Sequence, residues 1–471
     1  MIRPLIALAA LAPLAAWAQD GRVVFTGDVL LARNVEREIA ATGADPWARI
    51  RHVFGGADQV IGNFEGAVGT PADCSGPREA PCFAVATPRL ALLKQAGFTA
   101  LGLENNHNRD TGVDARAQTG AALQAIGLRG LTYEPAPWFL RLGDHTLAVV
   151  PYNEIPGIRG PGQKTPNLDL AQKIRWAHQL AELVVVYVHW GTELQDWPSE
   201  RQRTTARWLI RQGADLIVGH HPHVEQGMEC LEQVPVVYSL GNHVFDQKYP
   251  ATKRGGLLRC NVGAEATACS SWHSETANQT AFPQRVTEDA NAHAFWAQCP
   301  PRRHAALEFK GVRFAPAPQV AIQSAQELRL QLRGGVRATD YPAASVRALQ
   351  AVHFSPAPAD HLLLSLQLRH SSIDNTTGPR PYVYDLGPNG LVARWRGSAL
   401  AWPLLDFTVL TEDGSDYLCA LHRGDSFIAP NPATPQRRTQ VYRWSGFGFL
   451  GLETPGLAQR CAEHYAAFTG G

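Results

Sequence analysis

Short runs of apolar and β-branched residues alternate with segments of helical periodicity between Gly21 and about Gln247. The apolar runs predict strands at 23–26, 59–62, 100–103, 147–151, 183–188, 216–218 and 236–239. The segments between them predict helices at 30–41, 88–96, 114–126, 170–181 and 201–212. This alternation confines that part of the chain to an α/β fold, in which helices pack on β-sheet.

The rest of the 471-residue chain has a different character. Residues 251–343 are rich in Ala, Ser, Thr, Cys, Asn and Pro and predict an irregular, disulfide-held extension and linker. Residues 344–471 predict a β-rich C-terminal domain, because aromatic and glycine residues recur at 381–397 and 440–449, as in antiparallel hairpins or propeller-like blades. The predicted organisation is therefore an α/β domain at 19–250, an extension and linker at 251–343 and a β-rich domain at 344–471.

The first eighteen residues have the features of a cleavable export signal. Arg3 precedes an apolar run at 5–14, and Ala16-Trp17-Ala18 is a small-x-small cleavage site. The run is shorter than the ~20 residues that span a bilayer. We therefore expect cleavage after Ala18 and a periplasmic or secreted mature chain without an integral membrane span.

The number of cysteines indicates the compartment of the protein, and its charge balance limits which partners it can bind. All 8 cysteines follow the signal, and an even number suits a compartment where disulfides persist. Their connectivity is open, and we expect nearest neighbours to pair. The chain has 43 Lys and Arg against 42 Asp and Glu, with no run of like charge, which argues against a nucleic-acid partner.

Side chains that can bind metal follow strand after strand in the α/β region. They are Asp28, Asn63, Glu65, Asn106, His107, Asp110, His189, Glu193, His220, His221 and His223. Each alone is explained by a helix cap, a turn or a solvated loop. Because ligands of open α/β sheets bind beyond the carboxyl ends of the strands, we expect the set to converge in one cleft.

The donor types indicate the chemistry of that cleft. Asp, Glu, Asn and His without Cys suit Mn, Fe or Zn. A bridging carboxylate can hold two cations ~3.5–4 Å apart, which activate a water and neutralise a phosphate-like transition state. A metal-free His107 or His223 could protonate a leaving group. Arg33, expected one helical turn beyond Asp28, could clamp a carboxylate or phosphate or be a solvated helix residue.

Six ordered motifs resemble the CapA family, the poly-γ-glutamate capsule biosynthesis family of the metallophosphatase-like (calcineurin-like phosphoesterase) superfamily. They are GDVLLAR at 27–33, NFE at 63–65, NNHNRDTG at 105–112, HWGTE at 189–193, GHHPHV at 219–224 and YSLGNHVFD at 238–246. The resemblance covers about residues 20–250. It implies a four-layer α/β/β/α sandwich with a metal cleft at the strand ends.

Carried over position by position, the resemblance implies two divalent metal ions, of Mn, Fe or Zn, and a set of roles. The implied metal ligands are Asp28, Glu65, Asn106, His107, His189, His221 and His223. The implied catalytic residues are His107, Asp110, His223 and Arg33. The implied substrate-binding residues are Arg33, Glu193, His220 and His243.

The chain also departs from the superfamily pattern. Metallophosphatases at large have Asp-x-His at the first strand, whereas Val29 and Leu30 follow Asp28. Gly-His-His-Pro-His replaces Gly-His-x-His, which leaves open which two imidazoles coordinate. His243 stands where relatives tend to have Phe, either as an extra ligand or, as we expect, as a group supporting the ligands.

The resemblance implies an exported metal-dependent hydrolase-like protein that acts in synthesis, export or processing of a cell-surface anionic polymer such as poly-γ-glutamate. Its partners would be that polymer or a phosphate-ester substrate, together with capsule synthesis or export machinery. Two alternatives stay open. The protein could be a non-catalytic polymer-binding component of capsule assembly, or a periplasmic phosphoesterase acting on small phosphate esters.

Overall fold

The computed structural model describes most of the chain after the predicted export signal, which lies outside the described residues together with its cleavage site. The described residues are 20–74, 81–134, 136–157, 160–277, 279–305, 307–309, 312–316, 330–332, 344–354, 360–368, 377–387, 390–396, 400, 402–424, 437–446 and 448–469. None of the helices within these ranges is long and apolar enough to cross a membrane.

The first sheet is mixed and has the strand order β16-β15-β14-β1-β2-β5-β6, with β13 also paired to β1. Strands β1, β2, β5, β6 and β13 run parallel, and β14 to β16 are antiparallel additions beside β1. Its strands are β1 (Gly21–Val29), β2 (Gln59–Phe64), β5 (Ala100–Gly102), β6 (Arg129–Leu131), β13 (Asn242–Val244), β14 (Arg254–Val262), β15 (Thr267–Thr276) and β16 (Pro283–Glu288).

The second sheet has the order β11-β12-β10-β9-β8-β7, with β8, β9, β10 and β12 parallel. Its strands are β7 (Trp138–Leu142), β8 (His145–Asn153), β9 (Leu183–His189), β10 (Leu216–His220), β11 (Glu225–Leu231) and β12 (Val234–Leu240). A short parallel pair, β3 (Ala67–Val68) and β4 (Ala84–Val85), lies outside both sheets.

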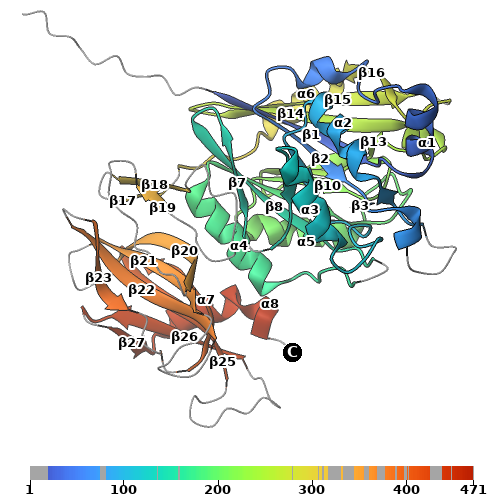
Figure 1. Cartoon of the computed structure of the whole chain (residues 1–471). Helices are drawn as coiled ribbons and strands as arrows, with labels where there is room; N and C mark the ends of the chain where they lie inside the picture. Colours follow the sequence, from blue (N-terminus) through green and yellow to red (C-terminus); the bar gives the residue numbers. More distant parts are fainter. Residues whose placement is uncertain are drawn as a thin grey trace, which may run out of the picture.

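The two sheets pack face to face with helices outside, and three apolar cores separate the layers (Figure 1). Residues such as Phe25 and Val185 alternate out of the strands into the core between the sheets. The helices covering the first sheet are α1 (Arg33–Thr42), α2 (Leu90–Ala96) and α3 (Ala115–Ala125). Those covering the second sheet are α4 (Leu168–Leu180) and α5 (Glu200–Gln212).

The predicted α/β fold is therefore confirmed, and all seven predicted strands lie within or overlap observed ones. Part of the predicted irregular extension is not irregular. Strands β14 to β16 lengthen the first sheet, because Leu258, Cys260 and Val262 alternate into the core between the sheets. The extension also contains α6 (His293–Gln298), whose Trp296 joins the same core.

The C-terminal part forms β-sheet, as predicted. Two four-stranded antiparallel sheets follow each other, in the orders β20-β21-β22-β23 and β24-β25-β26-β27. The strands are β20 (Ala344–His353), β21 (Asp360–Leu368), β22 (Gly378–Gly387), β23 (Gly390–Arg396), β24 (Leu404–Glu412), β25 (Ser415–Arg423), β26 (Arg437–Trp444) and β27 (Phe449–Leu452). Helices α7 (Pro455–His464) and α8 (Ala466–Thr469) follow them. A small sheet of β17 (Glu308–Phe309), β18 (Val312–Pro316) and β19 (Leu330–Leu332) precedes them.

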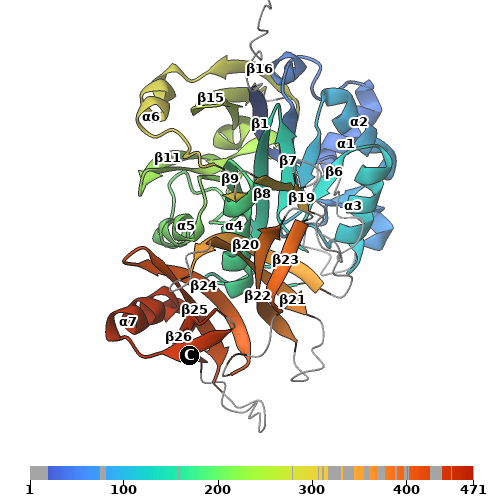
Figure 2. The ribbon, with the colours of Figure 1, turned by 90° about the vertical axis from the view of Figure 1, so that its left-hand side faces the viewer.

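Helix α4 joins the two parts of the molecule, because it lies between the second sheet and the C-terminal strands (Figure 2). Its Ala171 packs into the core of β25, β26 and α7. Arg175 forms an ion pair with buried Asp406 of β24, whose carboxylate also accepts hydrogen bonds from Gln172 and Tyr465.

Four disulfides link the eight cysteines. Cys74–Cys82, Cys260–Cys269 and Cys419–Cys461 join sequence neighbours, as expected. The fourth disulfide, Cys230–Cys299, does not join sequence neighbours. Cys260 of β14 and Cys269 of β15 lie between its two cysteines in the sequence and pair with each other. Four bridges suit an oxidising, extracytoplasmic compartment.

Candidate metal centre

The parallel strands of both sheets end at one edge and bring their polar residues together there. In the first sheet, Asp28 of β1 is in register with Asn63 of β2 and Asn242 of β13. In the second, His189 of β9 is in register with His220 of β10. The strand ends converge at this edge, as the sequence predicts, and the buried cluster of polar residues they form is called the cleft below.

Asp28 lies fully buried at the centre of this cleft. Its Oδ1 accepts a hydrogen bond from Asn63 Nδ2 at 2.8 Å and lies 3.3 Å from His220 Nδ1. Its Oδ2 lies 3.3 Å from His223 Nδ1. Burial raises the pKa of Asp28, but the two imidazoles outweigh burial and hold that pKa well below its ordinary value. Asp28 is therefore an ionised carboxylate inside the protein.

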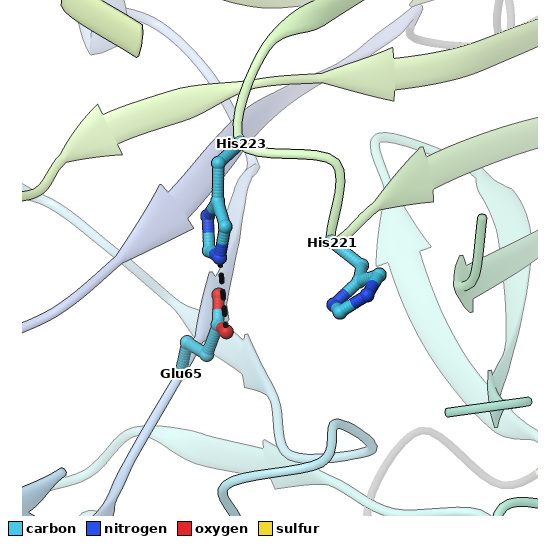
Figure 3. Close-up of side chains that lie close together, drawn as sticks. All are labelled: Glu65, His221 and His223. Atoms are coloured by element: carbon cyan, nitrogen blue, oxygen red, sulfur yellow. Dashed lines mark ion pairs between the residues drawn. The ribbon is translucent and has the colours of Figure 1, made fainter. Parts of the chain in front are cut away.

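Glu65, His221 and His223 form the group best suited to hold a cation (Figure 3). One ligand atom from each lies within 4.8 Å of the others, and all three residues are buried. His223 Nε2 faces Glu65 Oε1 at 3.6 Å. Burial lowers the pKa of His223, but Glu65 and Asp28 prevail and raise it to about 9. Burial and repulsion from His223 lower the pKa of His221 to about 3.

The backbone that carries these two histidines is strained. His221 has φ 98° and His223 has φ 60°, in the left-handed region that residues with a side chain rarely adopt. Each such residue costs of order 1–3 kcal/mol, and strain of this kind clusters at functional sites. The rest of the fold holds the turn after β10 in a conformation that presents both imidazoles to the cleft.

His107 is oriented from three sides. Its Nδ1 lies 2.8 Å from Asp110 Oδ2, and its ring stacks on Phe83 with centroids 3.7 Å apart. Phe83 N in turn donates to Asp110 Oδ2 at 2.8 Å. Its Nε2 is left facing Glu65 Oε1 at 3.9 Å. A carboxylate that fixes one imidazole nitrogen so that the other faces the site is the usual support of a metal-binding or proton-transferring histidine.

His189 is engaged by an amide at each nitrogen. Asn106 Oδ1 lies 2.8 Å from its Nε2, and Asn63 Nδ2 lies 3.3 Å from its Nδ1. Burial and the neighbouring His221 hold the pKa of His189 well below its ordinary value, so the ring is neutral. A neutral imidazole is the form that binds a metal.

The donors in the cleft fit a divalent metal ion. Both carboxylate oxygens of Glu65 and Nδ1 of His221 are buried and make no hydrogen bond among the described residues. Burial and the nearby acidic groups Asp28, Glu193 and Asp110 raise the pKa of Glu65 well above its ordinary value. Buried polar atoms without partners are costly unless another group satisfies them, and a cation would do so.

A second group with metal-binding capacity lies outside the cleft. His178 of α4, Asp215 and His304 bring ligand atoms within 4.8 Å of one another. Their two imidazoles stack with centroids 3.6 Å apart, and His178 Nδ1 lies 3.2 Å from the Gly213 carbonyl oxygen. The sequence-based prediction did not include this group.

Arg33 lies at a different place from the one expected. The helix begins at Arg33 instead of one turn earlier, because Leu30, Leu31 and Ala32 are buried in the core of the first sheet. Arg33 pairs with buried Asp246 at 3.1 Å, and its guanidinium lies 5.1 Å from the centroid of the Phe83 ring. Glu193 is exposed in the loop after β9, and it contributes to the acidic surroundings of Glu65.

His243 is not in the cleft, and its predicted place at the substrate or beside the ligands is wrong. Its ring packs among Trp47, Phe54 and Phe98 in the core beneath α1 and α2. Trp47 Nε1 donates a hydrogen bond to His243 Nε2 at 3.0 Å. Adjacent residues of a strand face opposite sides, so Asn242 faces the cleft while His243 faces the core.

The burial of His243 predicts an acid sensitivity that His243→Phe should remove. Burial lowers its pKa to about 3, so between about pH 6.5 and 3 the unfolded chain binds a proton that the folded chain does not. Wild-type stability should fall as pH falls through this window, by up to about 1.4 kcal/mol per pH unit from this residue. The free energy of unfolding in urea should be measured for both proteins at pH 8 and at pH 5. At pH 8 the variant should be less stable than wild type, because it has lost the Trp47 hydrogen bond. At pH 5 the difference in stability between variant and wild type should be smaller or reversed. A difference that does not change with pH contradicts the prediction.

Two residues of the centre have no ligand, catalytic or substrate-binding role among the predictions, although Asn63 is one of the predicted strand-end donors. Asn63 contacts both Asp28 and His189. Asn242 Oδ1 lies 3.0 Å from His223 Nδ1 and so fixes that ring. Both stand inside the motifs at strand ends, which was the available signal, but an asparagine in a strand-end turn is common for purely local reasons.

Comparison with known proteins places these observations in a family context. The sequence profile named "Bacterial capsule synthesis protein PGA_cap" matches residues 22–247. "PGA biosynthesis protein CapA" of Bacillus subtilis (strain 168) is 31% identical over 258 residues, or 52% of this chain and 68% of that protein. "Capsule biosynthesis protein CapA" of Bacillus anthracis is 30% identical over 314 residues, which are 57% of this chain and 73% of that protein. A crystal structure of a hypothetical protein from Thermus thermophilus aligns at 17% identity over 57% of this chain and 98% of its own, with a TM-score of 0.31, too low to support an argument.

Proposed function

The chain belongs to the PGA_cap (CapA) family of bacterial capsule synthesis proteins, and we propose that it is an exported, metal-dependent hydrolase acting on a cell-surface anionic polymer such as poly-γ-glutamate. The reaction would serve synthesis, export or processing of that polymer, and capsule machinery would be its partner. The four-layer arrangement around a strand-end cleft is the one expected of metallophosphatase-like proteins, and the export signal ending at Ala18 would deliver the chain to the periplasm or the exterior.

One observation carries the proposal: Glu65, His221 and His223 converge, and both Glu65 oxygens and His221 Nδ1 are buried without a hydrogen bond among the described residues. Asp28 would orient the His223 ring from its other nitrogen, because its carboxylate lies 3.3 Å from His223 Nδ1 while His223 Nε2 faces Glu65. A bound divalent cation of the Mn, Fe or Zn kind, or a pair, would polarise the scissile carbonyl or phosphoryl group and supply an activated water.

The surrounding residues can do the remaining work. His107 presents Nε2 to the cleft while Asp110 holds Nδ1, so the ring can deliver a proton to the leaving amine or alkoxide. Asn106 and Asn63 keep His189 in one orientation. The stacked Phe83 covers one face of His107 and excludes water from it.

Metal content and turnover test this function together. Wild type, Asp28→Ala and His189→Ala should be purified without a His tag, analysed for metal, and incubated with poly-γ-glutamate and with a phosphodiester. We expect wild type to hold divalent metal and to cleave the polymer, and both variants to lose metal and at least about 100-fold of the rate.

The alternatives give different results. Cleavage of the phosphodiester but not the polymer would favour a phosphoesterase of small esters. Metal binding without turnover of either substrate would leave a polymer-binding component. If wild type neither contains metal nor takes it up on titration, the hydrolase proposal is wrong.

A further inference from the structure

A pocket of about 320 Å³ opens beside the metal centre. The residues that matter for its chemistry are Glu104, Asn106, Arg109, Arg116, Asn153 and Gln163. They come from the loop after β5, from α3, from the end of β8 and from the segment after it. Its size is at the low end of small-molecule sites, which are typically ~300–1,000 Å³, so it suits a single chemical unit and not a length of polymer.

Two residues connect this pocket to the centre. Asn106 lines the pocket, and its Oδ1 lies 2.8 Å from Nε2 of His189. Asn153 also lines the pocket, and it ends β8 in register with His189 of β9. A ligand in the pocket is therefore next to the cleft, at the same edge of the sheets.

The carboxylates on the pocket wall have cationic partners, and Lys173, the partner of Glu134, is shared with Asp169. Arg116 Nη1 contacts Glu104 Oε1 at 2.5 Å, and that carboxylate also accepts a hydrogen bond from Tyr133 N. Glu134 is paired with Lys173 at 3.2 Å. The Arg109 side chain forms no ion pair or hydrogen bond among the described residues, although burial raises the pKa of the Glu104 carboxylate and the positive charge of Arg109 acts on that group to lower it. Arg109 is half-buried as a residue and lines the pocket, so an anion bound beside it would be screened less by water than on an open surface.

Two glycines line the pocket close to this arginine. Gly157 and Gly160 form a bridge, with Gly157 N donating to Gly160 O at 2.9 Å. A Cβ on Gly157 would lie 2.3 Å from the Asn106 carbonyl oxygen, and one on Gly160 would lie 3.0 Å from Arg109 Nη1. Glycine at these two positions lets the backbone of Gly157 and Gly160 approach Asn106 and Arg109 without a side chain filling the space.

We propose that this pocket is an anion subsite, in which Arg109 binds a carboxylate or phosphate carried by the substrate one unit away from the bond that reacts at the metal centre. The inference rests on the proposed function for the identity of the reacting site. An arginine fork matches both anions, because both present two oxygens in one plane. The subsite would select substrates with an anionic group at that position and align the neighbouring bond.

Calorimetric binding to the full chain tests the subsite with three probes: γ-linked tetraglutamate, the same oligomer with its α-carboxylates amidated, and glycerol phosphate. Arg109→Gln should weaken tetraglutamate binding at least 10-fold and leave the amidated oligomer unchanged, because only the carboxylate contacts Arg109. Arg109→Lys should fall between. Arg211→Gln, which removes an exposed arginine elsewhere, is the matched control and should bind like wild type.

The outcomes separate the subsite from the reaction. A loss confined to glycerol phosphate supports the anion subsite with phosphate as its source. Equal weakening of the charged and amidated oligomers, or no weakening of any probe, overturns it. If wild type binds but never cleaves tetraglutamate and Arg109→Gln still binds it more weakly, the hydrolase proposal fails and the subsite stands. If wild type cleaves it and Arg109→Gln has an unchanged KM, the subsite fails and the hydrolase stands.

Discussion

Glu65→Gln should bind Mn²⁺ or Zn²⁺ at least about 100-fold more weakly than wild type and yet be no less stable when metal is absent. The carboxylate is the one formally anionic member of the group formed with His221 and His223, so its loss removes most of the attraction for a cation. Without metal the same carboxylate destabilises the folded chain, because it is buried and neither of its oxygens is hydrogen-bonded among the described residues.

The sign of the pH effect follows from the raised pKa of Glu65. Its protonated form is favoured in the folded chain, so its contribution to stability is full below the unfolded pKa and is lost as pH rises through the folded value. Metal-free wild type should lose stability over that range, and Glu65→Gln should lose less. Thermal unfolding with and without metal measures both effects. Glu232→Gln, at an exposed carboxylate, should change neither. Equal stabilisation of wild type and Glu65→Gln by metal would show that Glu65 is not a ligand.

Asp406→Ala should produce the largest loss of stability outside the metal centre. Asp406 is buried and accepts hydrogen bonds from Arg175 and Gln172, which tie α4 to the C-terminal sheets, and from Tyr465 of the C-terminal part. Its removal leaves the Arg175 guanidinium without its carboxylate partner at a mostly buried position. Breaking a buried pair from one side typically costs about 3–5 kcal/mol.

That cost should lower the unfolding temperature of the C-terminal sheets by roughly 10 °C. Differential scanning calorimetry measures it on the full chain. Glu232→Ala breaks an ion pair whose arginine and glutamate side chains are 66% and 40% exposed, and such pairs contribute less than about 1 kcal/mol. A shift for Asp406→Ala as small as that of Glu232→Ala would mean that apolar packing alone, around residues such as Ala171, holds the two parts together.

The predictions that succeeded rest on local pattern. Strands such as 183–188 and 216–218 are apolar throughout, because both faces of a central strand are buried, and they were recognisable without any partner in view. The cleft followed from the same pattern, since the polar residues that end parallel strands must share an edge. The predicted convergence of Asp28, Glu65, His189 and His223 needed only that rule.

Residues whose role depends on which way a side chain faces were not predictable. His243 and Asn242 are neighbours in one motif, yet one contacts a core tryptophan and the other supports His223. Arg33 follows Asp28 closely in sequence, but its guanidinium forms an ion pair with Asp246, which is more than two hundred positions away in the chain. Strands β14 to β16 were not predicted. They are buried because β14 pairs with β1, and the composition of these segments gives no sign of that pairing.

The sequence by itself determined the α/β order of the first half, the edge at which its chemistry gathers and the kinds of donor found there, because these depend on periodicity and chain direction. Only the tertiary structure decided which donors meet. It left Glu65 and His221 with unsatisfied buried atoms, fixed His107 through Asp110 and Phe83, and placed Arg109 in the wall of the neighbouring pocket. Those relations are distances between strands and loops far apart in the chain, and they exist only once both sheets have packed.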